Sequence, residues 1–265
     1  MVLEGNLKKM RTDLDEEVNY FLDLNGQEVY MNDLLDKQIK LEYKNQINCI
    51  KCGRKTKTSF AQGYCYPCFI SAPETEECVL RPELCKAHEG IARDMNYAEE
   101  HCLIDHYVYM ALTSGIKIGV TRHHQVPTRW IDQGAWRIIK LALTPNRYIA
   151  GSIEVALKEF FVDKTNWRHM LTNKLLGGVD LVEEKDLAIE KLHVDFQQYA
   201  CDDDEITEIN YPVQEYPTKV KSLNFHKTPI IEDVLKGIKG QYLLFESGAV
   251  INIRKHNGYL VELGF

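Results

Sequence analysis

Residues 49–68 read CIKCGRKTKTSFAQGYCYPC, and this stretch decides how the chain is organised. It contains two Cys-x-x-Cys pairs, Cys49/Cys52 and Cys65/Cys68, separated by twelve residues. Each pair offers two thiolates from one tight turn, and two such turns complete a tetrahedral four-sulfur zinc site. A thioredoxin-like redox motif instead needs one such pair beside a strand–helix–strand pattern, which is absent here. We therefore predict a structural zinc ion with no open coordination position.

A second, looser group of ligand types follows the two pairs. Its members are Cys78, Cys85, His88, His101 and Cys102. Two interpretations stay open: the three cysteines hold a second zinc ion with either His88 or His101, or the cysteines are small buried apolar residues and the histidines are hydrogen-bonded. Residues 49–105 lack a periodic apolar pattern, so we expect metal to order this region. Cys201 has no neighbour at ligand spacing, and we assign it no role.

The composition limits the class of protein. The chain has 265 residues, of which 45% are hydrophobic, and this length suffices for about two domains. No apolar run approaches the roughly 18 residues of a membrane-spanning helix, and the opening residues lack the apolar core of a secretion signal. Eight cysteines in such a chain favour metal or free thiols over disulfides. We expect a cytoplasmic protein without a membrane partner.

Charge is distributed unevenly along the chain. The net charge is −7, but residues 106–171 hold nine Lys/Arg against four Asp/Glu, and residues 180–208 hold eleven Asp/Glu against two Lys. The basic segment is compatible with a phosphate-rich partner or with an ordinary solvated face. Its arginines are Arg122, Arg129, Arg137, Arg147 and Arg168. We expect nucleic acid, DNA or RNA, as the partner and leave a protein partner open.

The pattern of elements predicts an α+β fold with small β elements at both termini. The expected segments are an N-terminal β segment (1–48), a zinc-binding region (49–105), a central module (106–180), an acidic helix or linker (181–215) and a C-terminal β meander (216–265). The meander is expected to have strands at 241–245, 249–253 and 259–263. Because three strands with one apolar face need a cover, we expect the meander to pack against the N-terminal strands.

The central module alternates strands and helices. We expect strands at 107–112, 116–120 and 136–143, with a helix starting near 128 between the last two. A further helix follows, with one buried stripe at helical spacing formed by Ile149, Ile153, Leu157, Phe160 and Phe161. Glu154 lies at the edge of this stripe, where a carboxylate can face a cleft.

The residues of this module, in their order, resemble a GIY-YIG nuclease domain. Tyr109 stands in the place of the first motif's tyrosine, Lys117-Ile118-Gly119 in the second motif, Arg129 on the next helix, Glu154 on a later helix and Asn166 shortly after it. The resemblance implies a ββαβα module in which these residues are catalytic and Glu154 binds a divalent cation, Mg or Mn. Lys117 departs from the family pattern, which has a tyrosine at that place.

The chemistry of phosphodiester cleavage explains such a grouping. It needs a divalent cation, a carboxylate that holds it, an arginine on the phosphate oxygens and a group that orients water. Glu154, Arg129 and Tyr109 match these needs, although each also fits an ordinary role as a helical carboxylate, a surface ion-pair partner or a strand aromatic. We expect nucleic acid to contact Arg122, His123, His124, Arg129 and Arg137.

Three further segments resemble an uncharacterised bacterial family that joins a zinc ribbon to this module. They are GYCYPCF (63–69), RWIDQGA (129–135) and DKTNW (163–167). This resemblance implies architecture more than activity. The leading hypothesis is a zinc-containing nucleic-acid-binding protein with divalent-metal-dependent nuclease activity of GIY-YIG type. The alternatives are a non-catalytic RNA- or DNA-binding adaptor with a degenerate module, and a protein-binding module that uses the acidic run and the terminal strands.

Overall fold

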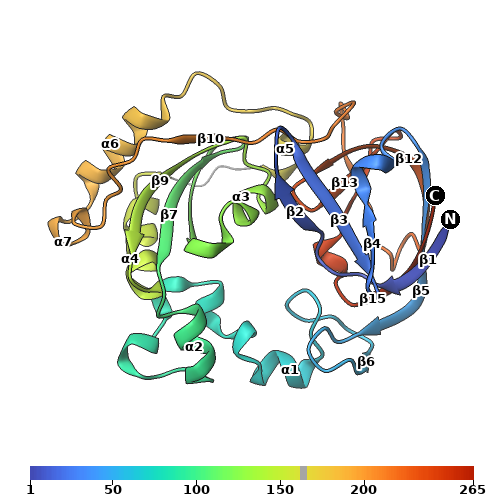
Figure 1. Cartoon of the computed structure of the whole chain (residues 1–265), viewed down its shortest axis with the longest axis horizontal. Helices are drawn as coiled ribbons and strands as arrows, with labels where there is room; N and C mark the ends of the chain where they lie inside the picture. Colours follow the sequence, from blue (N-terminus) through green and yellow to red (C-terminus); the bar gives the residue numbers. More distant parts are fainter. Residues whose placement is uncertain (162–165) are drawn as a thin grey trace. The chain divides into compact units, whose positions relative to one another are not determined.

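In a computed structural model the chain divides into two compact units, and the structure describes residues 1–161 and 166–265 (Figure 1). Unit 1 comprises Met1–Ile70, Leu171–Asn173 and Asn210–Phe265, and unit 2 comprises Ser71–Met170 and Lys174–Ile209. Most of unit 2 is therefore inserted in the sequence between the two halves of unit 1. The fold is mixed α+β with several sheets and few helices, as the sequence predicts.

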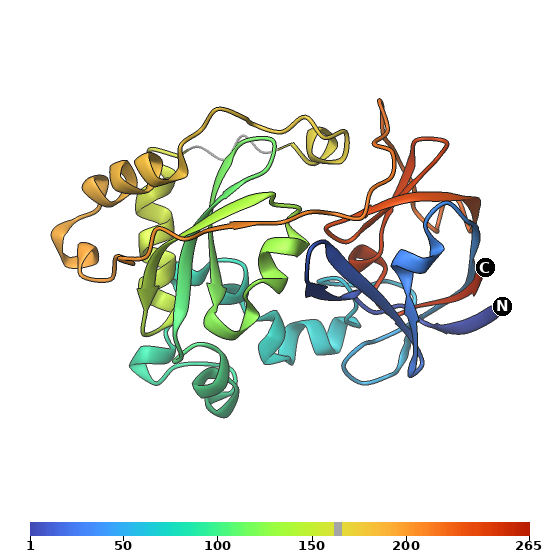
Figure 2. The same cartoon turned by 45° about the horizontal axis from the view of Figure 1, so that its top comes forward.

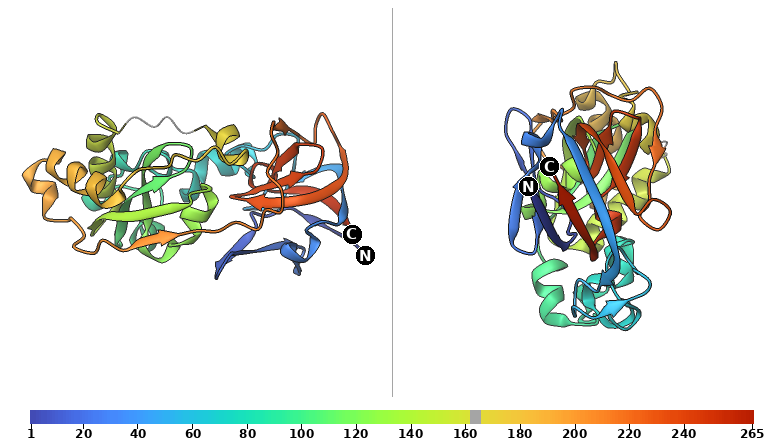
Figure 3. Two further views of the ribbon diagram at one scale, coloured as in Figure 1. Left: turned by 90° about the horizontal axis from the view of Figure 1, so that it is seen from above. Right: turned by 90° about the vertical axis from the view of Figure 1, so that its right-hand side faces the viewer.

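Unit 1 is built on a large sheet that combines strands from both ends of the chain (Figure 3). Its order is β1 (Val2–Asn6), β15 (Tyr259–Gly264), β5 (Gln38–Asn48), β12 (Ile230–Lys239), β13 (Tyr242–Phe245), β14 (Ala249–Asn252) and β11 (Lys221–Ser222), and β6 (Lys55–Thr56) pairs with β5. β15 lies between β1 and β5, antiparallel to both, with Leu263 opposite Leu3 and Leu41. The prediction that the two terminal regions pack together is confirmed.

The predicted three-stranded C-terminal meander is wrong at its last strand. β13 and β14 form a hairpin with Leu243 opposite Ile251, but the other neighbour of β14 is β11, which runs parallel to it. A short 3₁₀ helix, Arg254–His256, follows β14. This connection is longer than a tight hairpin loop, so β15 is free to leave β14 and pair with β1 and β5.

A smaller sheet completes unit 1. It contains β2 (Arg11–Leu14), β3 (Val18–Leu24) and β4 (Gln27–Tyr30). Every second residue of β3 from Val18 to Leu24 is buried, so this strand presents one face to the core. A turn at Asn25-Gly26 joins β3 to β4, with φ of 55° and 87° at these two residues.

Unit 2 has a four-stranded antiparallel sheet with helices around it (Figure 2). Its order is β10 (Ile206–Glu208), β9 (Arg137–Thr144), β7 (His106–Leu112) and β8 (Ile116–Arg122). The longest helix, α4 (Arg147–Lys158), packs on β7, β8 and β9 and buries Ile153 and Leu157. The other helices are α2 (Met95–His101), α3 (Thr128–Asp132), α5 (Trp167–Leu171), α6 (Leu181–Lys191) and α7 (Val194–Gln197), and α1 (Tyr66–Ser71) begins in unit 1.

Residues 106–158 follow the predicted order of strand, strand, helix, strand and helix, within a few residues of the expected bounds. The acidic run after α7 is irregular, but it is tied to unit 2: Lys140 Nζ lies 2.9 Å from Asp203, and the buried Lys185 lies 2.8 Å from Asp204. Throughout the described ranges, each helix is too short or too polar to cross a membrane.

Candidate functional site

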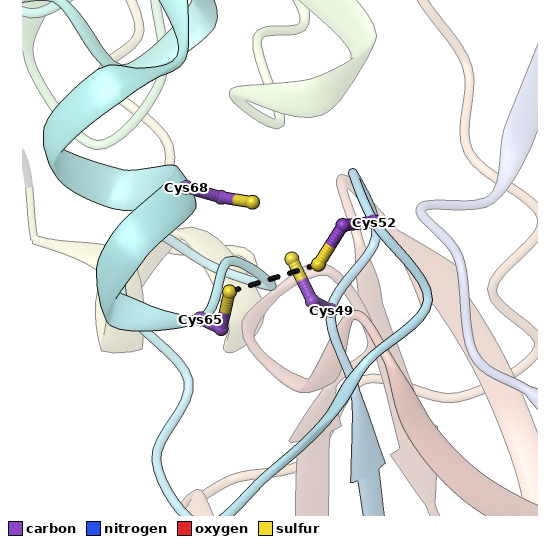
Figure 4. A group of neighbouring side chains, drawn as sticks. All are labelled: Cys49, Cys52, Cys65 and Cys68. Atoms are coloured by element: carbon purple, nitrogen blue, oxygen red, sulfur yellow. Dashed lines mark hydrogen bonds between the residues drawn. The ribbon is translucent and has the colours of Figure 1, made fainter.

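Four cysteine side chains meet where β5 ends and α1 begins (Figure 4). Cys49 and Cys52 lie in the turn after β5, and Cys65 and Cys68 lie at the start of α1. Their sulfur atoms all lie within 4.8 Å of one another, and the sulfurs of Cys52 and Cys65 are 3.8 Å apart. Zinc–sulfur bonds of about 2.3 Å place tetrahedral ligands about 3.8 Å apart. The four side chains therefore fit a single zinc ion.

The backbone around Cys49 favours the thiolate form. Gly53 has φ of 72°, and its N–H donates to the carbonyl of Cys49 at 2.8 Å, which closes the first turn. Burial raises the pKa of the Cys49 thiol, but hydrogen bonds from the backbone of Cys65, Cys52 and Lys51 outweigh this effect and lower it to about 6. Since the thiolate is the form that binds metal, the turn is prepared for a metal ligand.

Three cysteines of the later group also converge, in unit 2. They are Cys78, Cys85 and Cys102, which are buried and have sulfur atoms within 4.8 Å of one another. Hydrogen bonds from the Cys102 and Cys78 thiols lower the pKa of Cys85. Three thiolates can hold a metal ion and leave one tetrahedral position for another ligand.

Neither histidine predicted as the fourth ligand belongs to this group among the described residues. His88 stacks on Tyr148 with ring centroids 4.4 Å apart. His101 stacks on Tyr97, and its Nδ1 lies 3.1 Å from the carbonyl oxygen of Tyr97. The structure thus brings together the three cysteines and places both imidazoles in other contacts.

A buried arginine joins the three-cysteine group to α4. Arg147 is 8% exposed and opens this helix. Its guanidinium donates from Nη1 to the Cys78 sulfur at 3.7 Å and from Nη2 to the His101 carbonyl at 3.0 Å. Arg147 is therefore held inside unit 2. This position differs from the surface contact with phosphate that its place in the basic segment suggests.

The same helix packs closely on the loop that carries Cys85. A Cβ at Gly151 would lie 2.2 Å from the backbone nitrogen of Glu83, so only glycine allows this approach. Both Arg147 and Glu154 are on α4. The three-cysteine region therefore positions the helix that carries the predicted catalytic carboxylate.

Tyr109 is at the centre of the predicted catalytic group. It is completely buried in β7, opposite Gly119 of β8, and its ring meets Trp130 edge to face at 5.9 Å. Burial raises its pKa to about 12, the Arg129 guanidinium opposes this effect, and the Glu154 carboxylate adds to it. The side chains of Arg129 and Glu154 therefore both act on the Tyr109 hydroxyl.

Glu154 itself is largely buried. It is 9% exposed, and one of its oxygens lies 3.3 Å from Lys158 Nζ, one helical turn away. Burial raises the pKa of Glu154, while the positive charges of Lys158 and Lys117 oppose the rise. All five predicted catalytic residues lie in unit 2, and electrostatic interactions link four of them: Tyr109, Lys117, Arg129 and Glu154.

The fifth residue, Asn166, has a structural contact. Its side-chain oxygen accepts a hydrogen bond from the backbone of Arg168 at 2.9 Å, at the start of α5. Its backbone N–H donates to the Ser114 hydroxyl at 2.8 Å. Residues 163–165, which precede it in the motif DKTNW, lie outside the described residues.

The residues predicted to contact nucleic acid differ in how buried their side chains are and in whether their charge is already paired. Arg122 ends β8 and is half-buried, and burial lowers its pKa. His123 and His124 follow it with their rings edge to face at 5.1 Å. Arg137 lies 3.3 Å from a carboxylate oxygen of Glu208, so part of its charge is already balanced.

Sequence reasoning missed one polar group next to Tyr109. Gln133 lies one helical turn after Arg129 and acts on the pKa of Tyr109. The Arg129 and Gln133 side chains both act on the buried Tyr109 hydroxyl as hydrogen-bond donors, while Gln133 Oε1 is buried and has no hydrogen-bond partner among residues 1–161 and 166–265. The spacing of Arg129 and Gln133 is the signal that places them on one side of α3. A buried polar atom without a partner marks a place where water can bind.

Comparisons with known proteins give a family match. A family model described as "Protein of unknown function (DUF2797)" matches residues 36–261, which include both cysteine groups and the Tyr109 group. No curated protein and no solved structure matches the chain.

Proposed function

The chain belongs to the DUF2797 family of proteins of unknown function, and we propose that it is a zinc-containing protein that binds nucleic acid and cleaves a phosphodiester bond. The observation that carries the proposal is the grouping of Tyr109, Arg129 and Glu154 in unit 2, where both charges act on one buried hydroxyl. The order of these residues, which resembles that of GIY-YIG nucleases, supports the same activity. The four-cysteine site has a structural role.

Each residue of the group has a distinct task. Glu154 is the carboxylate that would hold a divalent cation, because Mg²⁺ binds through one or two carboxylates together with substrate phosphates. A cation bound there would neutralise negative charge on the scissile phosphate. Arg129 contacts the non-bridging phosphate oxygens as a fork of donors. Lys117, whose charge acts on Glu154, adds positive charge near the phosphate.

Tyr109 orients water in this scheme. Its pKa of about 12 keeps the hydroxyl protonated at neutral pH, so it does not remove a proton by itself. The Arg129 and Gln133 side chains act on its oxygen as hydrogen-bond donors, which leaves the phenolic O–H to donate to a water molecule beside the phosphate.

One observation favours a second candidate, a non-catalytic nucleic-acid-binding adaptor. Glu154 is buried and paired with Lys158 at 3.3 Å, and burial raises its pKa. A carboxylate in this setting binds a cation more weakly than a free one, because the cation must displace the lysine and the charge must stay buried. Arg129 and Lys117 would then bind phosphate without cleavage.

The test compares three proteins on labelled single- and double-stranded DNA and RNA, with and without Mg²⁺ or Mn²⁺. Each protein keeps its zinc and is freed of other divalent ions. In Glu154→Gln we expect retained folding and binding and a cleavage rate lowered at least about 100-fold, because the charge that holds the cation is lost. Glu159→Gln, an exposed carboxylate at the end of the same helix, is the matched control. Wild-type binding without cleavage under any metal would establish the adaptor, and undiminished cleavage by Glu154→Gln would exclude this site.

A further inference from the structure

Unit 1 contains a polar cavity of about 560 Å³. Three parts of this unit line it: the loop between the two cysteine pairs, residues 221–228, and residues 252–259 around the last 3₁₀ helix. Its volume is within the range of about 300–1,000 Å³ that is common for small-ligand sites. The cavity is built from unit 1 alone and contains none of the residues of the Tyr109 group.

The charge in this cavity has one sign. Lys221, Lys227 and Lys255 line it, and no described lining residue is acidic. Within the described chain, none of these three lysines forms an ion pair. Three uncompensated cations around a concave surface create a positive potential that attracts anions.

Two amide side chains of the cavity can offer hydrogen-bond donors to a ligand. The side-chain oxygen of Asn224 accepts from the backbone of His226 at 2.8 Å, and that of Asn252 accepts from the backbone of Lys255 at 2.9 Å. Both amide oxygens are engaged, so the NH₂ groups remain for a ligand. Ser222 and Thr228 add hydroxyl groups to the lining.

We propose that this cavity binds a phosphate group of a nucleotide, either free or within a nucleic-acid strand. Lysine ammonium groups bind phosphate oxygens as point charges, and three of them line this cavity together with the two amide groups. The volume exceeds what inorganic phosphate alone requires. The site is distinct from the proposed phosphodiesterase centre, so an experiment can refute one of the two proposals without refuting the other.

The test measures binding of ATP, inorganic phosphate, a single-stranded oligonucleotide and poly-glutamate to the full zinc-loaded chain by calorimetry at low salt. Lys227→Glu/Lys255→Glu reverses two charges of the cavity. Lys219→Glu is the matched control, because Lys219 is exposed on the same segment but lines a different hollow, with Glu215 and Glu246. Melting temperature and zinc content verify that each variant is folded.

We expect wild type to bind ATP or the oligonucleotide, the double variant to lose at least about tenfold in affinity, and Lys219→Glu to stay within about twofold. Binding of ATP identifies free nucleotide as the source, and binding of the oligonucleotide alone identifies nucleic acid. Unchanged affinity in the folded double variant, equal binding of poly-glutamate, or no binding of any phosphate probe overturns the proposal.

Discussion

The Tyr109 hydroxyl lies directly over the backbone of Gly119: a methyl group added at Gly119 would be 2.6 Å from the phenolic oxygen and 2.7 Å from Cζ. The two residues are opposite each other in the β7–β8 hairpin. The glycine therefore provides the space in which Tyr109 reaches Arg129 and Glu154. This contact gives the Ile118-Gly119 motif a physical reason, because no larger residue leaves room for the ring.

Gly119→Ala should displace Tyr109 and destabilise unit 2. Overpacking a buried site costs about 1–3 kcal/mol, which chemical denaturation measures directly. Any cleavage activity should fall together with stability. Gly177→Ala is the control, because a Cβ there meets nothing within 4 Å. Equal stability of the two variants would contradict the close contact.

Cys49→Ser should remove one zinc ion per chain. Wild-type protein should contain at least one, because four sulfurs lie within 4.8 Å of one another. Elemental analysis measures the zinc content, and thermal unfolding measures the melting temperature. In Cys49→Ser both quantities should fall together, because the metal orders its loop. Cys201→Ser should change neither, because Cys201 belongs to neither cysteine group. A folded wild type without zinc would refute the site.

Cys85→Ser decides between the two interpretations of the second group. If the three buried cysteines hold metal, wild type contains close to two equivalents and the variant close to one. If they are only packed thiols, wild type contains one equivalent and the variant keeps it. We expect the first result, because the guanidinium of Arg147 beside Cys78 offsets the negative charge of buried thiolates. Elemental analysis on folded samples gives the answer.

Lys239→Met should change how stability depends on pH. Lys239 is buried over the rings of Tyr211 and Tyr216, at 5.1 and 5.2 Å, and burial lowers its pKa from 10.5 to about 8. Between these two values the unfolded chain holds a proton that the folded chain has lost, so wild-type stability should rise as the pH increases. The total rise is roughly 3 kcal/mol.

In Lys239→Met this rise should be absent, and stability near pH 7 should be equal to or above that of wild type, because no charge needs to be buried. Denaturant unfolding between pH 7 and 10.5 measures both. Lys37→Met, at an exposed position of the same unit, serves as the control. If the free energy of unfolding of the variant rises with pH as steeply as that of wild type, Lys239 is not the source of the rise.

The elements of unit 2 could be predicted from local patterns. The alternation from His106 to Arg122 predicts a hairpin, and the spacing of Ile149, Ile153 and Leu157 predicts α4. Both predictions succeed because the period of the apolar residues indicates which side chains are buried in the same core. The four-cysteine group also depends on local spacing. It was therefore readable before any tertiary contact was known.

What the sequence did not reveal depends on long-range packing. The separation of β14 from β15 requires that β5 and β1 offer a better partner, which no local pattern reports. Arg147 is one arginine among several in a basic segment, and only the fold places it against Cys78. The cavity lysines are spread over residues 221–255 and become neighbours through the sheet of unit 1.

The order of strands in unit 1 also constrains when this unit can fold during translation. β5 leaves the ribosome well before β12 and β15, the strands that flank it in the sheet. In the interval unit 2 is synthesised, and β5 keeps unpaired edges that can associate with other nascent chains. The sheet closes only when the final strand has emerged. Assembly of unit 1 therefore has to follow the synthesis of unit 2, and it depends on pairing between strands that are far apart in the sequence.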